Sequence, residues 1–378
     1  MNKKFKIGCL TFFVVIFATS TIFAGYLYFE LKVDDAKYIQ KNTFLNKPFT
    51  DSLYIISKNI RNKSQIAFGV YRNDSLYTFG LKRENDSLLF VENRYSLFGI
   101  GSISKTFTAT LLTQMHIDEE LDMNDDLSLY TGIKMPNKIK ISLKQLANHT
   151  SGLPRIAKKS SFFEDDNGQP YLKYDEKWLN QFLEKEMELE YPQNEISNYS
   201  NLGAGILGHI LAKQHKTSYE NLVQKQLFDL LNMNNSSADY NKVKSKLVAS
   251  YTIEGTPASI WQFKSPTIGA GGIFSNVEDM IKWAKIQMDT TQKAFQMTHI
   301  PSANTSKGSK IGLGWHLVTK NNKNYLFHNG QIGIDGGYSS SMLVDTKNKI
   351  AIVILSNIAD ITNMGFVDKL AFLVERHL

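Results

Sequence analysis

The sequence contains a single cysteine, Cys9, among 378 residues. One thiol cannot close an internal disulfide, and it cannot supply a cysteine-based metal site. The chain also lacks internal repeats, low-complexity tracts and any basic cluster interleaved with aromatic residues. These absences argue against a disulfide-stapled fold, a disordered chain and a nucleic-acid-binding protein.

No charge of one sign dominates the chain. The 43 Lys and Arg against 36 Asp and Glu give a formal net charge of +7, and three of the lysines lie within the first six residues. The rest of the chain therefore carries only +4. With 42% hydrophobic residues, a chain of this length supports one large globular domain, or two closely packed ones, with a sizeable core.

One long apolar run is present, residues 7–29, and it follows a basic tail at 1–6. About 20 apolar residues cross a bilayer, so this run predicts a transmembrane anchor. Because lysines favour the cytoplasmic side, we expect the rest of the chain outside the cytoplasm, in a periplasmic or extracellular location. A signal peptide cleaved near Ala24, which would give a secreted protein, is the alternative.

Strand patterns lie near both ends of the chain. A polar linker over 30–49 leads into a short predicted helix, Leu53 to Ile60. The sequence then predicts a hairpin and, near the C-terminus, three more strands, all with apolar runs bounded by turn residues. These strands are Ile66 to Tyr71, Leu76 to Leu81, Asn324 to Asn329, Tyr338 to Val344 and Lys349 to Ser356, and an amphipathic helix over 363–377 follows them.

The middle of the chain, about 107–250, has mainly helical signals. Capping patterns indicate helix starts at Ser142 with Gln145, at Thr217 with Glu220 and, further on, at Ser275 with Glu278. We therefore predict an α/β (α+β) fold. An antiparallel sheet built from both chain ends carries flanking helices and an inserted helical subdomain, and together they form one domain over 50–378.

The segment from Gly99 to Leu112 contains the most informative spacing. Ser102 and Lys105 are three residues apart, at the start of a helical pattern that follows a strand-like run. On a helix this spacing puts the hydroxyl and the amine on one face. A lysine in a desolvated, positively charged pocket can lose its proton and activate a serine nucleophile, and the helix N-terminus can stabilise an oxyanion.

Two glycine-containing stretches permit a nucleotide-binding interpretation. Gly99 to Thr106 differs by one residue from the phosphate-binding loop pattern, because Ser104 stands where the glycine before the lysine is required. Gly269 to Ser275 does not complete a dinucleotide-binding pattern, and tight backbone packing in a turn explains its glycines better. Neither stretch is accompanied by the expected acidic residue at a strand end.

Two further elements follow Ser102 and Lys105 along the chain. Tyr199 and Asn201 precede an apolar helix, and His328, Gly330 and Gln331 end a predicted strand. In this order the elements resemble those of the serine penicillin-binding protein and β-lactamase family, closest to class C β-lactamases, DD-carboxypeptidases and related esterases. Tyrosine replaces the serine of the second class A element, and histidine replaces the lysine of the third.

Other residues with similar patterns receive a structural interpretation. Tyr71-Arg-Asn73 and Lys310-Ile-Gly312 repeat the spacing of the second and third elements. The first precedes Ser102 and lies in a hairpin turn, and the second lies in a Gly-Leu-Gly-Trp segment where the family has no catalytic element. His149 could act as a base, but a hydrogen-bonded structural role is the favoured interpretation.

The resemblance implies a role for each residue. Ser102 would form an acyl-enzyme, with Lys105 and Tyr199 transferring the proton, and which of the two is the base stays open. The N–H groups of Ser102 and Gln331 would form the oxyanion hole. Asn201 would bind a substrate amide, His328 would orient a substrate carboxylate or the Tyr199 hydroxyl, and Gly330 would let substrate approach the backbone.

The resemblance also implies the class of reaction. It predicts a serine hydrolase that acts on a D-Ala-D-Ala-like peptide, such as the peptidoglycan stem peptide, and needs no metal or organic cofactor. A β-lactamase or carboxylesterase is the alternative enzyme on the same scaffold. A penicillin-binding sensor or wall-binding protein without catalysis is the alternative from another class.

Overall fold

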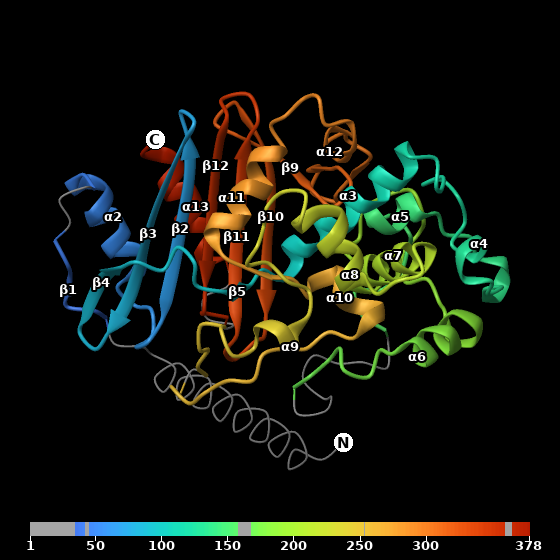
Figure 1. The fold of residues 1–378 in the computed structure, drawn as a ribbon, viewed down its shortest axis with the longest axis horizontal. Coiled ribbons are helices and arrows are strands. Elements are labelled where there is room, and N and C mark those ends of the chain that lie inside the picture. Colours follow the sequence, from blue (N-terminus) through green and yellow to red (C-terminus); the bar gives the residue numbers. More distant parts are fainter. Residues whose placement is uncertain (1–34, 42–44, 158–167, 253, 360–364) are drawn as a thin grey trace, which may run out of the picture.

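The computed structural model describes residues 35–41, 45–157, 168–252, 254–359 and 365–378 (Figure 1). A ten-stranded sheet is its main element, in the order β1-β4-β3-β2-β12-β11-β10-β9-β8-β7. Neighbouring strands are antiparallel, except that β1 and β4 run parallel. The strands are β1 (Tyr38–Ile39), β2 (Gln65–Arg72), β3 (Ser75–Glu84), β4 (Ser87–Val91), β7 (Ala303–Asn304), β8 (Lys310–Ile311), β9 (His316–Lys320), β10 (Lys323–Ile332), β11 (Tyr338–Asp345) and β12 (Ile350–Ser356).

The sheet joins the two ends of the chain, as the strand pattern predicts. Strand β12 pairs with β11 on one side and with β2 on the other. The β2–β3 hairpin closes at the pair Arg72 and Ser75, so its loop consists of Asn73 and Asp74. Both loop residues have positive φ, 51° and 56°. Asn and Asp tolerate this conformation, and it matches the twist of a two-residue hairpin.

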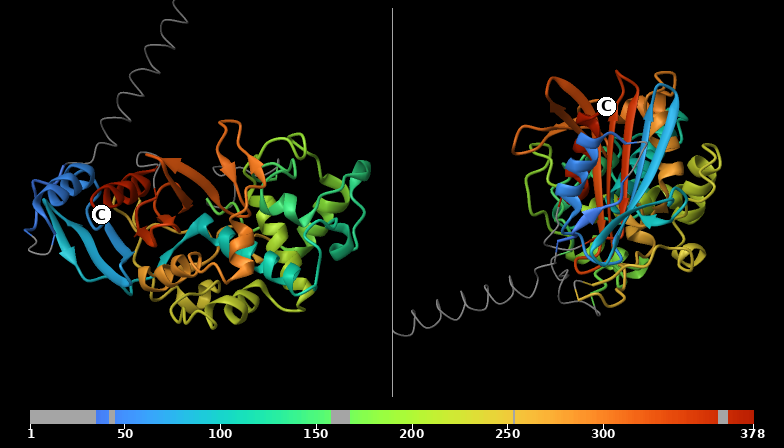
Figure 2. Two further views of the ribbon diagram at one scale, coloured as in Figure 1. Left: turned by 90° about the horizontal axis from the view of Figure 1, so that it is seen from above. Right: turned by 90° about the vertical axis from the view of Figure 1, so that its left-hand side faces the viewer.

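Alternate residues of the central strand β12 face two separate cores. Ile352 and Ile354 join a cluster with helices α2 (Lys47–Ser57) and α13 (Phe366–Arg376). Val353 and Leu355 join the larger core on the other face, beneath helix α11 (Val277–Ile286). Figure 2 shows α2 and α13 side by side on one face of the sheet. The period of two along a strand therefore lets one apolar strand serve both layers.

The helical part lies beside the sheet (Figure 1) and is built around two buried helices. In α3 (Ser104–Ile117) every residue from Ser104 to Thr113 is buried, and α7 (Asn201–Gln214) is buried up to Ala212. A short pair, β5 (Phe98–Gly99) with β6 (Phe274–Ser275), leads into α3. The other helices are α4 (Ser128–Thr131), α5 (Leu143–Ala147), α6 (Glu176–Gln181), α8 (Tyr219–Val223), α9 (Tyr240–Val243), α10 (Ser265–Gly271) and α12 (Lys293–Thr298). Single turns of other helix types are η1 (Gly101–Ile103), η2 (Pro136–Lys138), η3 (Phe182–Glu186) and η4 (Gln224–Phe228).

Of the three predicted helix starts, one is confirmed and two are wrong by one residue. Ser142 and Gln145 form the expected reciprocal capping box of α5. The N-cap of α8 is Ser218 and not Thr217. The N-cap of α11 is Asn276, because Ser275 belongs to strand β6 and hydrogen-bonds through its hydroxyl to Ser236.

The glycine-rich stretch at 269–272 is not the predicted turn, because its first part ends helix α10. The predicted tight packing is present. A Cβ on Gly269 would lie 3.0 Å from Thr108 Oγ1, and one on Gly208 of α7 would lie 3.1 Å from the Cα of Gly269. The two helices therefore approach each other at glycine.

The predicted membrane anchor, residues 7–29, lies outside the described residues. Within the described part of the chain, none of the helices combines the length and apolar character needed to cross a bilayer. The expected 30–49 linker is in part structured, because Tyr38–Ile39 pairs with β4 and α2 starts at Lys47. Helix α2 begins earlier than the predicted Leu53 because Asn46 caps it and Pro48 occupies its first turn.

Candidate active site

Ser102 lies where the chain passes from strand β5 into helix α3. It belongs to the 3-10 turn η1, so it precedes the α-helix on which we expected it. Gly101, just before it, has a positive φ of 51°. A Cβ there would lie 2.6 Å from the backbone nitrogen of Gln331, so both the conformation and the close approach of β10 require glycine.

Lys105, in the first turn of α3, is 2% exposed. Its Nζ lies 3.1 Å from Ser102 Oγ, 2.8 Å from Asn201 Oδ1 and 2.6 Å from the carbonyl oxygen of Ala270. Burial, followed by the charge of Arg155, holds the pKa of Lys105 well below its usual value. The amine therefore favours its neutral form, with two N–H donors for the Asn201 and Ala270 oxygens and a lone pair for Ser102.

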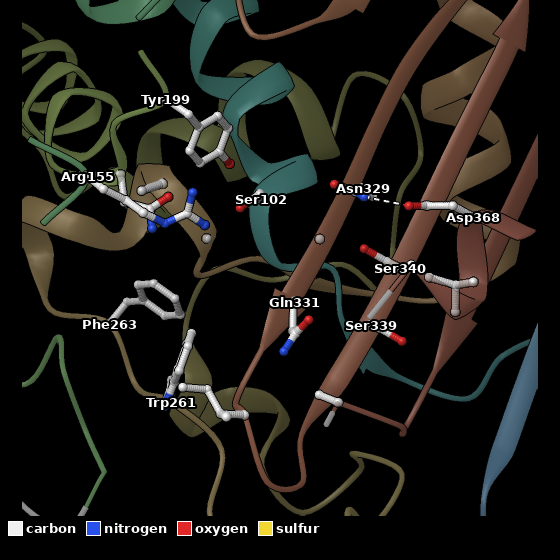
Figure 3. Close-up of a pocket in the computed structure, with 18 of the residues that line it drawn as sticks. Ser102, Arg155, Tyr199, Trp261, Phe263, Asn329, Gln331, Ser339, Ser340 and Asp368 are labelled. Carbon is white, nitrogen blue, oxygen red and sulfur yellow. Dashed lines mark hydrogen bonds between the residues drawn. The ribbon is translucent and has the colours of Figure 1, made fainter. Parts of the chain in front are cut away.

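Tyr199 lies just before α7 with its ring against the lysine. Lys105 Nζ is 4.7 Å from the ring centroid, and Figure 3 shows the phenol directed toward Ser102. Burial raises the pKa of Tyr199 to about 12, although a hydrogen bond with Ser102 and the charge of Arg155 lower it in part. The phenol therefore keeps its proton near neutral pH.

Asn201 holds the lysine in place. Its Oδ1 accepts from Lys105 Nζ, and its Nδ2 donates to the Tyr171 hydroxyl at 2.9 Å. The side chain also lines the cavity, so one N–H remains for a substrate group. The sequence predicted the substrate contact but not the contact with Lys105.

Three histidines surround the Tyr199 ring. The ring centroids of His149, His328 and His316 lie 4.6, 6.3 and 6.4 Å from that of Tyr199. Burial is the first cause that lowers the pKa of all three, and the charge of Arg155 also lowers that of His149. The histidines are therefore neutral, and this part of the site carries no imidazolium.

In His328 and in His149, a hydrogen bond shows whether the ring nitrogen Nδ1 donates or accepts. The Nδ1 of His328 lies 2.6 Å from the carbonyl oxygen of Asn329. Since a carbonyl only accepts, this Nδ1 carries the proton and Nε2 is left as an acceptor. His149 Nδ1 accepts from the backbone N–H of Ser200, which agrees with the structural role predicted for it.

The edge of β10 forms the wall opposite Lys105. Strand β9 pairs only with residues 323–327 of β10, so Gly330 and Gln331 lie beyond that pairing and line the cavity. A Cβ on Gly330 would lie 2.0 Å from the Ile100 carbonyl oxygen and 2.8 Å from the backbone nitrogen of Ser102. The backbones of Ser102 and Gln331 are thus adjacent, as two oxyanion-hole donors must be.

Ser102, Tyr199, Asn201, Gly330 and Gln331 line one cavity of about 690 Å³ (Figure 3). The sequence-based interpretation missed other residues of its lining, namely Arg155, Tyr171, Trp261, Phe263, His316, Asn329 and Asp368. Arg155 could have been noticed, because it directly follows the turn that contains His149. The aromatic residues have no local signal, since their stretches resemble ordinary irregular chain.

Residues with misleading spacing lie elsewhere. Tyr71 is in β2 and hydrogen-bonds to Asp74 in the hairpin turn, and Lys310 is in β8. Neither lines the cavity. The phosphate-loop alternative also fails, because β10 fills the space beside Gly101 that a phosphate would need.

The model of the family described as Beta-lactamase matches residues 66–373, most of the chain. The chain belongs to the β-lactamase family. A β-lactamase from Providencia stuartii is 30% identical over 62% of this chain and 59% of its own length. The chain spans 54–59% of the length of the first curated relatives that it matches.

Solved structures share the β-lactamase fold. A D-alanine carboxypeptidase from Burkholderia cenocepacia superposes with a TM-score of 0.71 at 19% identity, over 87% of this chain and 98% of the other. A class C β-lactamase in complex with cefoxitin has a TM-score of 0.70 at 21% identity, over 88% and 98%. The predicted family and the mixed α/β fold are therefore confirmed.

Proposed function

We propose that this chain is a serine hydrolase that forms an acyl-enzyme on Ser102 and acts on D-Ala-D-Ala-like peptides or related amides. One observation carries the proposal: the buried amine of Lys105 contacts the hydroxyl of Ser102. The Asn201 side-chain oxygen and the Ala270 carbonyl accept the two hydrogens of this amine. Membership of the β-lactamase family and the fold shared with a D-alanine carboxypeptidase support the substrate class.

Lys105 acts as the base in this mechanism. Its lone pair accepts the Ser102 proton while Ser102 Oγ attacks the substrate carbonyl. The N–H groups of Ser102 and Gln331 donate to the oxygen that becomes negative. Tyr199, whose phenol keeps its proton, then protonates the leaving group, and Lys105 returns a proton to the phenolate beside it. Water then releases the acyl group by the same proton transfers in reverse. Tyr199 passes its proton to Lys105, the phenolate takes a proton from the attacking water, and Lys105 returns a proton to Ser102 Oγ.

The remaining residues position these groups. Asn201 and the Ala270 carbonyl fix the direction of the Lys105 lone pair. His328 is buried and does not line the cavity, so its Nε2 acceptor is assigned to the Tyr199 hydroxyl and not to the substrate. Gly330 keeps the β10 edge open to the substrate backbone. The mechanism uses no metal or organic cofactor.

A β-lactamase or carboxylesterase is the second candidate, and the 30% identical Providencia relative, itself a β-lactamase, favours it. A panel of nitrocefin, a D-Ala-D-Ala peptide and a short-chain ester, each given to the purified full-length protein, tests both. Steady release of D-alanine supports the peptidase. Faster turnover of nitrocefin or of the ester supports the second candidate. Acylation by penicillin without turnover of any of the three would instead identify a penicillin-binding sensor and contradict the proposal.

The proposed location is outside the cytoplasm, with residues 7–29 as a membrane anchor. The apolar composition of that run and the lysines before it support this placement. Fractionation of cells tests it: the anchor predicts full-length chain in the membrane fraction. Soluble chain that begins near residue 24 would support secretion after signal cleavage.

A further inference from the structure

The positive charge of the candidate active site is at Arg155. It is the only Lys or Arg among the described residues that line the cavity, and it is exposed. Lys105 favours its neutral form, and so does His328 at the third element. The cation that faces a substrate therefore comes from the loop after α5 and not from strand β10.

The backbone at Arg155 is fixed to the start of α7. Its carbonyl oxygen accepts the N–H groups of Asn201 at 3.0 Å and of Leu202 at 3.2 Å. The carbonyl of Pro154 accepts the Ser200 hydroxyl at 2.7 Å. The guanidinium lies over the Tyr199 ring, 4.9 Å from its centroid. The charge is therefore held in a defined place beside the reacting groups.

The N–H groups of this guanidinium can meet a substrate. Two other arginines in the described part of the chain pair with side-chain carboxylates, Arg61 with Asp335 and Arg94 with Glu278. The described ion pairs do not include Arg155. A guanidinium over an aromatic face keeps its in-plane N–H groups, whose fork matches the two oxygens of a carboxylate.

Asp368 is the only carboxylate among the described residues of the cavity lining. Figure 3 shows it across the cavity from Arg155, beyond β10, and it accepts from Asn329 Nδ2 at 2.7 Å. Trp261 and Phe263 lie on the Arg155 side in Figure 3, and the ring of Tyr171 stacks on that of Phe263 with centroids 4.5 Å apart. The Arg155 side thus combines one cation with an aromatic wall.

We infer that Arg155 binds a carboxylate of the substrate and makes the site selective for anionic over neutral acyl compounds. The inference rests on the proposed function, because it assigns the substrate class of the same site. The carboxylate can belong to the acyl part or to the leaving group. Arg155 would bind the carboxylate in the same way at either position, and ligands that carry it at one position only distinguish the two cases.

The test measures binding of unreactive anilides to the Ser102→Ala protein by calorimetry. Valeranilide is the neutral ligand, glutaric acid monoanilide places a carboxylate on the acyl part, and 3-(valerylamino)benzoate places it on the leaving group. Each ligand is titrated into proteins with Arg155, Arg155→Gln and Arg155→Lys. Arg376→Gln, at an exposed position in the last turn of α13, is the matched control for loss of one positive charge.

We expect at least one anionic anilide to bind about tenfold or more tightly than valeranilide, as for a hydrogen-bonded charge pair. Arg155→Gln removes this preference, Arg155→Lys keeps part of it, and Arg376→Gln leaves it unchanged. Equal binding of neutral and anionic anilides, or a preference that survives Arg155→Gln, would overturn the inference. Hydrolysis of 4-nitrophenyl valerate by the protein with Ser102 intact tests the proposed function separately.

Discussion

Lys105 Nζ lies 3.1 Å from Ser102 Oγ, and both groups are fixed by parts of the chain that are distant in sequence. Asn201 from α7 and the Ala270 carbonyl from α10 accept the other hydrogens of the amine. This arrangement leaves one direction for the lone pair, toward the serine. The neutral amine of Lys105 is therefore the group that can take a proton, and the protonated phenol of Tyr199 is the group that can give one.

Lys105→Ala removes the proposed base and is expected to lower kcat/KM for acylation about 10²- to 10⁴-fold. The reason is that no other unprotonated amine contacts Ser102 among the described residues. Stopped-flow acylation by nitrocefin measures the effect. Lys310→Ala is the control, because it removes the lysine of the Lys-x-Gly pattern in β8, away from Ser102. This variant should react like the parent protein. Rapid acylation of Lys105→Ala would rule out this base.

Tyr199→Phe removes only a hydroxyl and should slow acylation about 10²- to 10⁴-fold, because the leaving group loses its proton donor. The decrease should be greatest for amides, whose leaving groups need a proton most. The same change at Tyr71, whose hydroxyl bonds to Asp74 in the hairpin, is the matched control. If both variants cleave an amide at the parent rate, Tyr199 has no part in proton transfer.

The pH dependence follows from the two shifted groups. Lys105 works only when unprotonated, and burial and Arg155 lower its pKa, so kcat/KM should rise with pH well below the value of 10.5 usual for lysine. At high pH, kcat/KM should fall when the phenol of Tyr199 loses its proton, and the pKa of Tyr199 is about 12. Arg155→Gln removes a repelling charge, raises the Lys105 pKa and moves the rise to higher pH. The measurement is the pH profile of kcat/KM for a neutral ester, recorded for the parent protein and for Arg155→Gln. A rise near pH 10.5 in the parent protein would contradict the lowered pKa of Lys105.

Gly330→Ala should lower acylation about 10²- to 10³-fold by separating the two oxyanion-hole donors. The new Cβ would lie 2.0 Å from the Ile100 carbonyl oxygen, so β10 and η1 must move apart. Gly203→Ala in α7 is the control, since its Cβ would meet only ordinary contacts at 3.4 Å and beyond. Circular dichroism confirms that both variants fold. Parent-like acylation of Gly330→Ala would show that this close contact is not required.

The sequence predicted the parts of this site that have local patterns. Ser102 and Lys105 are close in the chain, and Tyr199, Asn201 and His328 stand next to recognisable helix or strand boundaries. Strands β2, β3 and β10–β12 were also predictable, because apolar residues and turn residues mark them. The predicted fold, a sheet from both ends of the chain, followed from these strands.

Other features depend on contacts between distant segments. Trp261 and Phe263 reach the cavity only because α10 packs on α7, and no pattern around them indicates this. Thr217 and Ser218 both have hydroxyls that can cap a helix, and Ser218 is the N-cap of α8. The Asn201 contact with Lys105 also joins two distant helices, so the motif alone suggested only a substrate contact.

Intact-protein mass spectrometry after reaction with penicillin tests the central claim most directly. We expect one adduct with the mass of the antibiotic, located by peptide mapping on Ser102 and absent from Ser102→Ala. An adduct of the same mass on Ser102→Ala, or one mapped to another residue of the parent protein, would contradict the assignment of Ser102 as the nucleophile.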